Sequence, residues 1–126
     1  GARAFMRFNE FRNARQILTD SLNVHWDSGL AALYGDVAGD DTLEQIDQAE
    51  RWLAQHHSDA ALLLSLGKLC VRQRLWGKAE AYLDASISLT PSHDAYMKLG
   101  QLAEELNKPN EASACFRKAM DLQGRG

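Results

Sequence analysis

Residues 60–70 read Ala-Ala-Leu-Leu-Leu-Ser-Leu-Gly-Lys-Leu-Cys, and residues 93–103 read His-Asp-Ala-Tyr-Met-Lys-Leu-Gly-Gln-Leu-Ala. In both stretches a Leu-Gly pair lies within a series of apolar residues spaced three and four apart, which is typical of one face of a helix. Gly67 and Gly100 are 33 residues apart. A fixed repeat of this length predicts an array of stacked helical units.

The repeat continues into a second helix of each unit. Residues of matched size recur at the same spacing, pairing Ala79 with Ala112, Leu83 with Phe116, and Ser86 with Ala119. Small residues allow two helices to approach closely, and we expect Leu83 and Phe116 to fill the space between successive helix pairs. Because one pair cannot bury its apolar face alone, the units must stack.

This pattern resembles the tetratricopeptide repeat. In that family a Leu-Gly pair marks the first helix, a small–large–small series marks the second, and a proline closes the unit. Pro91 closes the unit at 60–92, whereas the unit at 93–122 is followed by Gly124. The resemblance implies an all-α fold, namely an alpha-alpha superhelix of tetratricopeptide-type helix hairpins.

The apolar spacing predicts seven helices, and no segment alternates with the period of two that a strand would need. Thr42 and Gln45 have the spacing of a capping box at a helix start. Asn107 suits a left-handed helix end, and Pro109 suits a first helical turn. The predicted helices cover residues 3–22, 25–38, 42–57, 60–73, 76–89, 93–106 and 109–122.

The chain is expected to form one domain over residues 1–126, because its length is that of a single core. Residues 3–57 form a degenerate copy of the repeat, in which Tyr34 replaces the glycine. Residues 3–22 look like the second helix of a unit that lacks its partner.

The helix at 3–22 carries an apolar stripe formed by Phe8, Phe11, Ala14, Leu18 and Leu22. Leaving such a stripe exposed is unfavourable, and an unsatisfied apolar face usually marks an interface. We expect this helix to fold back across the helix that contains Trp26. The alternative is a contact between two copies through Phe5 and Phe8, so the chain is predicted to be a monomer or a weak homodimer.

Composition narrows the class of partner. The chain has 126 residues, of which 45% are hydrophobic and 25% charged, with a formal net charge of −3. A nucleic-acid binder normally has a clear basic excess, so a nucleic-acid partner is not expected. The sequence contains no apolar run of the roughly 18 residues that a membrane span requires.

Three stretches carry a more specific resemblance: residues 25–35, residues 49–56, and residues 62–70 continuing to 75–79. Together they resemble the C-terminal half of the proteobacterial HemY family, which is named for protoheme biosynthesis. Members of that family have two membrane-spanning helices ahead of a tetratricopeptide region. The resemblance implies a full-length inner-membrane protein whose anchor precedes Gly1, with this domain in the cytoplasm. It carries no catalytic residues.

The histidines are candidate haem or metal ligands. They are His25, His56, His57 and His93. All four fall at predicted helix ends or linkers, where a solvated or capping histidine is common, and the sequence lacks a C-x-x-C-H attachment motif. We therefore predict no cofactor and no metal.

The remaining reactive or aromatic residues favour structural roles. Cys70 lies on an apolar stripe and Cys115 beside Phe116, so both are interpreted as packed thiols, although a bridge between them stays open. Three tryptophans, Trp26, Trp52 and Trp76, are interpreted as packing residues. The acidic residues Asp36, Asp40, Asp41, Glu44 and Asp47 do not follow calcium-loop spacing.

No acid–base pair, nucleophile triad or phosphate loop is present in the sequence, so we do not expect an enzyme. In a tetratricopeptide stack the first helices line a concave groove. By resemblance, this groove would include Leu64, Lys68, Val71, Arg72, Met97, Gln101, Glu104 and Glu105, with Ala61 and Asp94 beside them.

The expected partner is a protein, bound as a helix or as an extended peptide segment of mixed charge. The favoured interpretation is a non-catalytic interaction scaffold linked by resemblance to haem biosynthesis. Two alternatives stay open: a carrier that itself binds haem or a porphyrin, and a cell-envelope assembly adaptor with no connection to haem.

Overall fold

The computed structural model describes the backbone of residues 2–37 and 41–125, and the side chains of residue 10 and of residues 12–37 and 41–123. These residues form seven helices and no strand, as predicted. The helices are α1 (Ala2–Val24), α2 (Ser28–Tyr34), α3 (Thr42–Gln55), α4 (Ala60–Arg72), α5 (Trp76–Leu89), α6 (His93–Glu105) and α7 (Pro109–Arg125).

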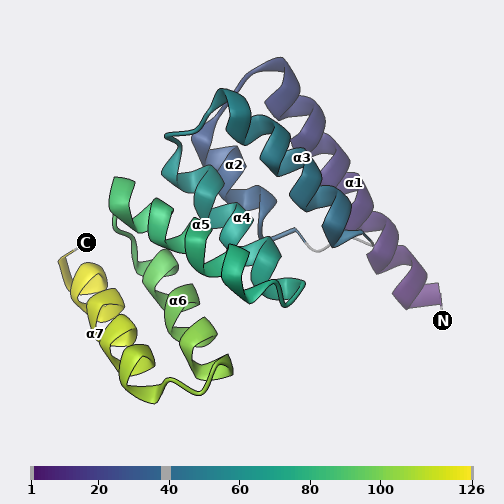
Figure 1. The fold of residues 1–126 in the computed structure, drawn as a ribbon. Helices are drawn as coiled ribbons and strands as arrows, with labels where there is room; N and C mark the ends of the chain where they lie inside the picture. Colours follow the sequence, from purple (N-terminus) through teal and green to yellow (C-terminus); the bar gives the residue numbers. More distant parts are fainter. Residues whose placement is uncertain (1, 38–40, 126) are drawn as a thin grey trace.

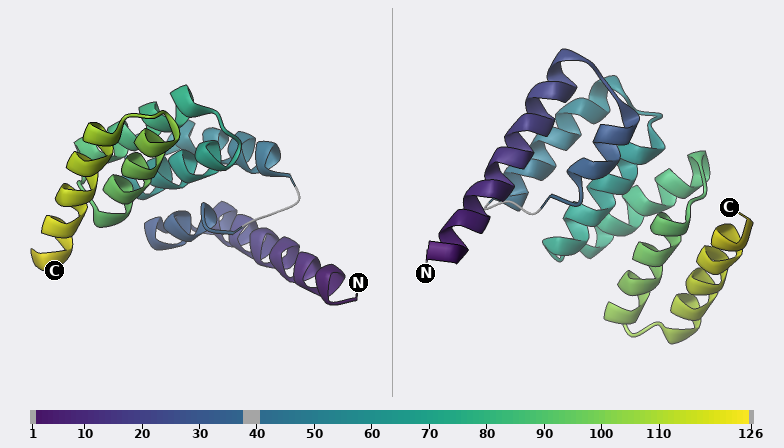
Figure 2. Two further views of the ribbon diagram at one scale, coloured as in Figure 1. Left: turned by 90° about the horizontal axis from the view of Figure 1, so that it is seen from below. Right: turned by 180° about the vertical axis from the view of Figure 1, so that it is seen from behind.

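Helices α4 and α5 form one antiparallel hairpin, and α6 and α7 form a second hairpin packed beside the first (Figure 1). Helices α1 and α2 lie together on one side of α3 and α4, as the left view of Figure 2 shows. The described N-terminal end of α1 and the hairpin α6–α7 lie at opposite ends of the molecule.

The hairpins have the close approach that the repeat predicts. A Cβ atom built on Gly67 would lie 2.5 Å from Leu83 Cδ2, and one on Gly100 would lie 2.5 Å from Phe116 Cε1. Leu83 and Phe116 therefore pack against the glycines of their own hairpins, and their expected contact with successive pairs stays a prediction. Ala79 is completely buried.

The turns between paired helices use left-handed residues. Asn107 has a φ of 57° and ends α6, as predicted, and α7 then begins at Pro109. Arg74 has a φ of 58° at the matching place after α4, which the sequence did not indicate because arginine has no special preference for this conformation.

The start of α3 differs from the prediction. Asp41 is the N-cap, and its side chain accepts a hydrogen bond from the Glu44 backbone N–H at 3.0 Å. Thr42 is the first residue of the helix, so the Thr42–Gln45 capping box is wrong. The Gln45 amide instead donates to the Val37 carbonyl at 2.8 Å and fixes the chain that precedes α3.

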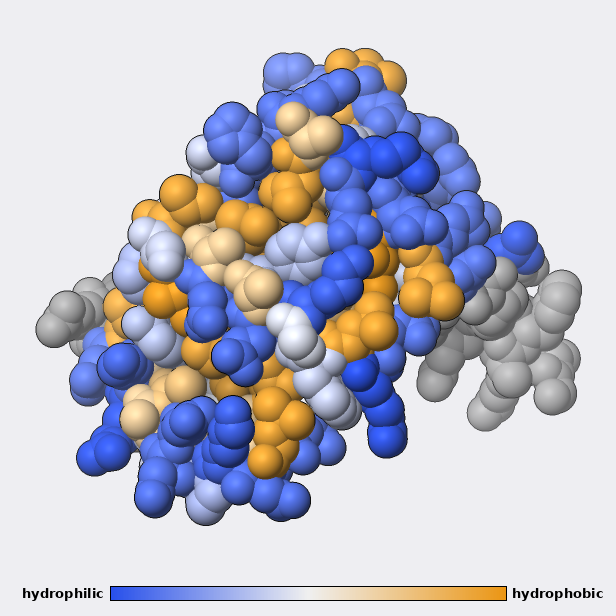
Figure 3. Space-filling view, in the orientation of Figure 1, coloured by the Kyte–Doolittle hydropathy of each residue, from blue (hydrophilic) through white to orange (hydrophobic). Residues whose placement is uncertain are grey.

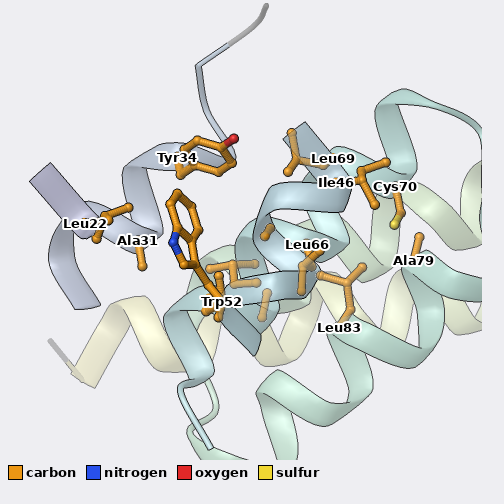
Figure 4. Close-up of a cluster of buried hydrophobic side chains, with 14 of the residues drawn as sticks. Leu22, Ala31, Tyr34, Ile46, Trp52, Leu66, Leu69, Cys70, Ala79 and Leu83 are labelled. Atoms are coloured by element: carbon orange, nitrogen blue, oxygen red, sulfur yellow. The ribbon is translucent and has the colours of Figure 1, made fainter. Parts of the chain in front are cut away.

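The first unit packs in a different way from the hairpins. Helices α2 and α3 each pack on α4, and aromatic rings fill the space between them. Tyr34 meets Trp52 edge to face at 4.9 Å, and Trp26 meets Trp52 at 5.8 Å. Figure 4 shows Tyr34 and Trp52 within the buried cluster, which continues through Leu66 towards α5.

Helix α2 is short because it fits closely on α4. It spans seven residues, where the sequence predicted 25–38. A Cβ atom on Gly35, the C-cap, would lie 2.7 Å from Ser65 Cα. The Gly35 N–H donates to Ser65 Oγ at 3.1 Å, and the Ser65 hydroxyl donates to the Ala31 carbonyl.

Helix α1 folds back on α2, as expected. Leu22 is buried and Leu18 packs against the core cluster. The Trp52 indole N–H donates to Asn23 Oδ1 at 2.9 Å and ties α1 to α3. The side chains of Phe5, Phe8 and Phe11 lie outside the described residues, so the contact between two copies stays a prediction.

Candidate functional site

The predicted groove residues on α4 are not all accessible. Leu64 is only 7% exposed and belongs to the hydrophobic core. Val71 is half-buried and packs against the same core. The expectation that Leu64 faces an open groove is therefore wrong, because α4 is surrounded by α2, α3 and α5 and has little free surface.

The two basic residues on α4 are engaged by α2 and the residues that follow it. Lys68 Nζ lies 2.9 Å from Asp36 Oδ1, and its side chain is only 9% exposed. The Arg72 guanidinium donates to the Gly35 carbonyl at 2.7 Å. Burial lowers the pKa of Arg72, while the nearby Asp36 carboxylate partly opposes this effect. Lys68 is thus not a free groove residue, and Arg72 holds the C-terminal end of α2.

The predicted residues on α6 are more accessible. Gln101, Glu104 and Glu105 are exposed, as is Asp94, and Met97 is half-buried. None of the described hydrogen bonds or ion pairs of the structure involves the side chains of Gln101, Glu104 or Glu105. These side chains are therefore available to a partner without loss of any described contact within the chain.

The predicted groove therefore has two unequal parts. On α4 its polar side chains are used within the molecule, whereas on α6 they are exposed and mainly acidic. The sequence suggested a basic repeat followed by an acidic one. In the folded chain Asp36 pairs with Lys68, whereas Arg72 donates to backbone carbonyls and stays exposed; the exposed residues of α6 are mainly acidic.

A second candidate is a cavity of about 620 Å³ between the start of α2 and the start of α4. Trp26 lines it and stacks in parallel on His56, with ring centroids 3.9 Å apart. The indole N–H of Trp26 donates to Asp59 Oδ2 at 2.8 Å. His57, on the cavity lining, is exposed.

Asp59 organises this cavity. Besides Trp26, the Ser28 hydroxyl donates to Asp59 Oδ2 at 2.6 Å, and the Leu62 backbone N–H donates to its other oxygen at 3.1 Å. Burial pushes the pKa of Asp59 up, but these hydrogen bonds outweigh it, and the net pKa is lowered. Asp59 is therefore an ionised N-cap that joins α2 to α4.

Sequence reasoning missed Asp59, although a signal existed. Asp27, Asp59 and Ser92 are the N-caps of α2, α4 and α6. They recur at nearly the repeat spacing, and each is a residue type favoured at a helix start. A search for capping residues in register with the Leu-Gly pairs would have found Asp59 and Ser92.

A polar link between α3 and α5 was also missed. The Tyr82 hydroxyl donates to Glu50, and Lys78 Nζ lies 3.1 Å from the same carboxylate oxygen. Burial raises the pKa of Glu50, but the bonds from Tyr82 and Lys78 outweigh this effect and lower it overall. Burial and the hydrogen bond to Glu50 raise the pKa of Tyr82.

The remaining histidines have structural positions. His56 is the C-cap residue of α3, and His93 Nδ1 lies 3.0 Å from the Ala119 carbonyl in the second hairpin. His25 is exposed. Within the described residues no group of three or more His, Cys, Asp or Glu side chains is placed to hold a metal ion.

Both cysteines are free thiols. Cys70 is completely buried, as predicted, and burial raises its pKa to about 11. Cys115 is half-buried, and burial also raises its pKa. A thiol with a raised pKa is rarely ionised at neutral pH and is therefore a poor nucleophile.

The acidic residues near the start of α3 have separate structural contacts. Asp36 pairs with Lys68, Asp41 caps α3, and Glu44 lies 4.0 Å from Arg15. Asp40 lies outside the described residues. The tryptophans pack as predicted: Trp52 is buried, and Trp26 and Trp76 lie against the core cluster.

Comparisons with known proteins agree with this architecture. Residues 93–125 match the family model described as tetratricopeptide repeat. The structure reported as "Crystal structure of MamA" is similar to the chain with a TM-score of 0.72 and 21% sequence identity, covering 98% of this chain and 74% of that chain. The fold is an all-α tetratricopeptide superhelix. No curated protein matches the chain significantly.

The MamA likeness concerns the fold alone at this level of identity. The resemblance to the HemY family and the link to haem stay predictions. Among the described helices, none combines the length with the apolar composition that crossing a bilayer requires.

Proposed function

We propose that the chain is a non-catalytic scaffold that binds another protein through the exposed side of α6. The observation that carries this proposal is the row Gln101, Glu104 and Glu105, which is exposed and has no described polar contact within the chain. Stacked helical repeats provide extended surfaces for binding, and such exposed polar residues are not needed for the packing of the hairpin.

The chemistry of α6 indicates the kind of segment that it would bind. Asp94, Glu104 and Glu105 are acidic, while Met97 adds a half-buried apolar contact. A helix or an extended peptide segment with both basic and apolar residues would complement this surface. Electrostatic complementarity of this kind mainly raises the association rate and excludes partners of the wrong charge.

We further propose that the full-length protein is anchored in the inner membrane, with this domain in the cytoplasm and a role linked to haem (protoheme IX) biosynthesis. This part of the proposal is supported by the resemblance of residues 25–35, 49–56 and 62–79 to the HemY family. The net charge is −3, so the chain has no basic excess, and this supports a protein partner over a nucleic acid.

Capture of partners from a solubilised membrane fraction tests the scaffold. The intact protein should retain a specific partner, and Glu104→Lys combined with Glu105→Lys should reduce its capture at least tenfold. Asp47→Lys combined with Asp121→Lys is the matched control, because it makes the same charge change on the exposed surfaces of α3 and α7. Equal loss in both double variants would contradict a binding site on α6.

The captured protein also decides between the two scaffold hypotheses. A partner that acts in haem synthesis would support the HemY-like role. A partner that builds the cell envelope would support the alternative of an assembly adaptor without a connection to haem.

The cavity lined by Trp26 favours a second candidate, a carrier of haem or a porphyrin. Its volume of about 620 Å³ lies in the range of about 300–1,000 Å³ that is typical of small-molecule sites. An aromatic ring and two histidines line it. His56 is stacked on Trp26, so His57 is the residue whose ring is available for an axial bond.

Titration of the domain with haem tests the carrier. A saturable shift of the Soret band that is lost in His57→Ala but kept in His25→Ala would support it. The exposed His25 is a suitable control because it does not line the cavity. A linear, non-saturable response would contradict the carrier without affecting the scaffold on α6.

A further inference from the structure

A smaller cavity lies between α5 and the second hairpin, away from the predicted groove residues. It has a volume of about 240 Å³. Apolar side chains, mainly from α6 and α7, line the cavity. Charged side chains from α5, from Lys108 before α7 and from the first turn of α7 also line it. Its lining residues are Glu80, Asp84, Leu99, Leu102, Ala103, Leu106, Lys108, Glu111, Ala114 and Cys115.

The charges around this cavity are unbalanced. Glu80, Asp84 and Glu111 face a single ammonium group, that of Lys108. None of the described ion pairs involves any of the three carboxylates. Burial raises the pKa of Asp84, and the negative charge of Glu80 raises it further. Three carboxylates thus share the lining with one lysine, and none of the three has a described ion pair.

The carboxylates act at the cavity itself. Burial is the main cause of the raised pKa of Cys115; the positive charge of Lys118 opposes it, and the negative charges of Asp84 and Glu111 add to it. Asp84 belongs to α5 and Glu111 to α7, and the negative charges of both act on the Cys115 thiol. A cation placed beside Cys115 would thus be attracted by both carboxylates and repelled by Lys118.

The remainder of the cavity is apolar. Leu102 is only 1% exposed, and Leu99 and Leu106 pack against the core cluster. On the face drawn in Figure 3, hydrophobic surface is interspersed with hydrophilic surface over α5 and the second hairpin. An occupant must therefore combine an apolar stem with a cationic head.

We infer that this cavity is a docking pocket for one arginine side chain of a partner protein. The inference extends the proposed scaffold function by a second point of contact. An arginine buries its methylene stem on apolar surface while its guanidinium stays at the polar rim. Carboxylates bind the planar guanidinium through paired hydrogen bonds, which favours arginine over lysine.

Other occupants fit less well. The volume is below the roughly 300–1,000 Å³ typical of sites for drug-sized molecules and cofactors. An anion would be repelled by the three carboxylates. A purely apolar side chain would fill the floor but leave the mutual repulsion of Glu80 and Asp84 in place.

Disulfide tethering at Cys115 tests this inference without the partner. The domain is equilibrated, at fixed reductant, with small disulfides that end in a guanidinium, a hydroxyl or a carboxylate, and peptide mapping gives the occupancy of Cys115. We expect the guanidinium reagent to be retained several-fold more than the hydroxyl reagent, and the carboxylate reagent least. Cys70 is completely buried and should stay unmodified.

Two controls separate docking from general attraction of cations. Asp84→Asn with Glu111→Gln should abolish the preference, whereas Asp47→Asn with Asp121→Asn, which makes the same change elsewhere, should keep it.

Excess N-acetyl-arginine amide should slow alkylation of Cys115 by iodoacetamide, and N-acetyl-citrulline amide should not. Equal retention of the three reagents, or no protection by the arginine amide, would overturn the pocket while leaving partner capture by α6 untouched.

Discussion

The first unit, α2 and α3, differs from the two later hairpins at one position of the repeat. Gly67 and Gly100 bring their hairpin partners close, whereas Tyr34 occupies the same place in the first unit. A phenol ring there meets the Trp52 indole, so α2 and α3 pack separately on α4. Where the hairpins have a close glycine contact, the first unit thus has an aromatic-filled layer.

This difference has a consequence for the binding surface. Because α2 is not closed onto α3, it packs on α4 through Gly35 and Ser65 instead. Asp36 and the Gly35 carbonyl then reach Lys68 and Arg72. The degenerate unit therefore engages the polar groups of Lys68 and Arg72 on α4, of which Arg72 stays exposed, whereas Gln101, Glu104 and Glu105 on α6 have no described polar contact within the chain.

Removal of the Trp52 side chain should break the first unit. The indole is 6% exposed, contacts the rings of Trp26 and Tyr34, and donates to Asn23. Trp52→Ala should lower the free energy of unfolding by about 3–5 kcal/mol. Trp52→Phe keeps a ring but loses the hydrogen bond, so it should cost clearly less. Urea denaturation measures both, and equal costs would show that the ring contacts are unimportant.

Alanine substitutions at glycine compare the close contacts directly. Gly35→Ala and Gly67→Ala should each cost about 1–3 kcal/mol through overpacking, because the new Cβ meets Ser65 backbone or the buried Leu83. Gly100→Ala should cost less, since Phe116 is only half-buried and can move. Gly77 is the control: a Cβ atom added there would meet no atom within 4 Å, and Gly77→Ala should stabilise by up to about 1 kcal/mol. Thermal unfolding that ranked Gly77→Ala below Gly67→Ala would contradict the packing.

Much of this architecture follows from the sequence, for reasons that are local. The Leu-Gly pairs and the matched small residues fix the hairpins, because a helix contact repeats wherever the same sizes recur. Asn107 and Pro109 mark a turn by their own backbone preferences. These signals predicted all seven helices within a few residues, apart from the length of α2.

The candidate site was predicted less well, because exposure depends on neighbours distant in sequence. The sequence pattern predicts that Lys68 faces the groove. The fold brings Asp36 next to Lys68, and this contact cannot be read from the sequence pattern. Leu64 is buried for the same reason. The sequence did not indicate that the Ser65 hydroxyl forms hydrogen bonds with the backbone of Gly35 and Ala31, because a serine within a helix has no unique partner.

The link between Lys68 and Asp36 should have a small but measurable energy. Lys68→Met, Asp36→Asn and the double variant form a cycle whose coupling should be about 0.2–1 kcal/mol, because the Asp36 side chain is still 56% exposed. Urea denaturation at low and high salt measures it. A coupling of zero at both salt concentrations would show that the ion pair does not hold α2 on α4.

Low pH should weaken the contact between α2 and α4 at Asp59. The pKa of Asp59 is lowered in the folded chain from its usual value of 3.8, so its hydrogen bonds stabilise the fold above that pH. This stability is lost as the pH falls through the lower folded pKa. Denaturation midpoints between about pH 7 and about pH 2.5 should fall less steeply in Asp59→Asn than in the unaltered chain. Parallel curves would show that Asp59 does not contribute to the acid sensitivity.

Acetylation of lysines in the native, unaltered domain tests most directly whether α2 closes the α4 half of the groove. Lys68 is 9% exposed and paired with Asp36, whereas Lys108 and Lys118 are exposed. With limiting acetylating reagent and mass spectrometry of the peptides, Lys68 should react at least tenfold more slowly than Lys108 and Lys118. Asp36→Asn should raise its rate. Equal rates at the three lysines in the unaltered domain would contradict the closed half, and would restore a groove that runs across both α4 and α6.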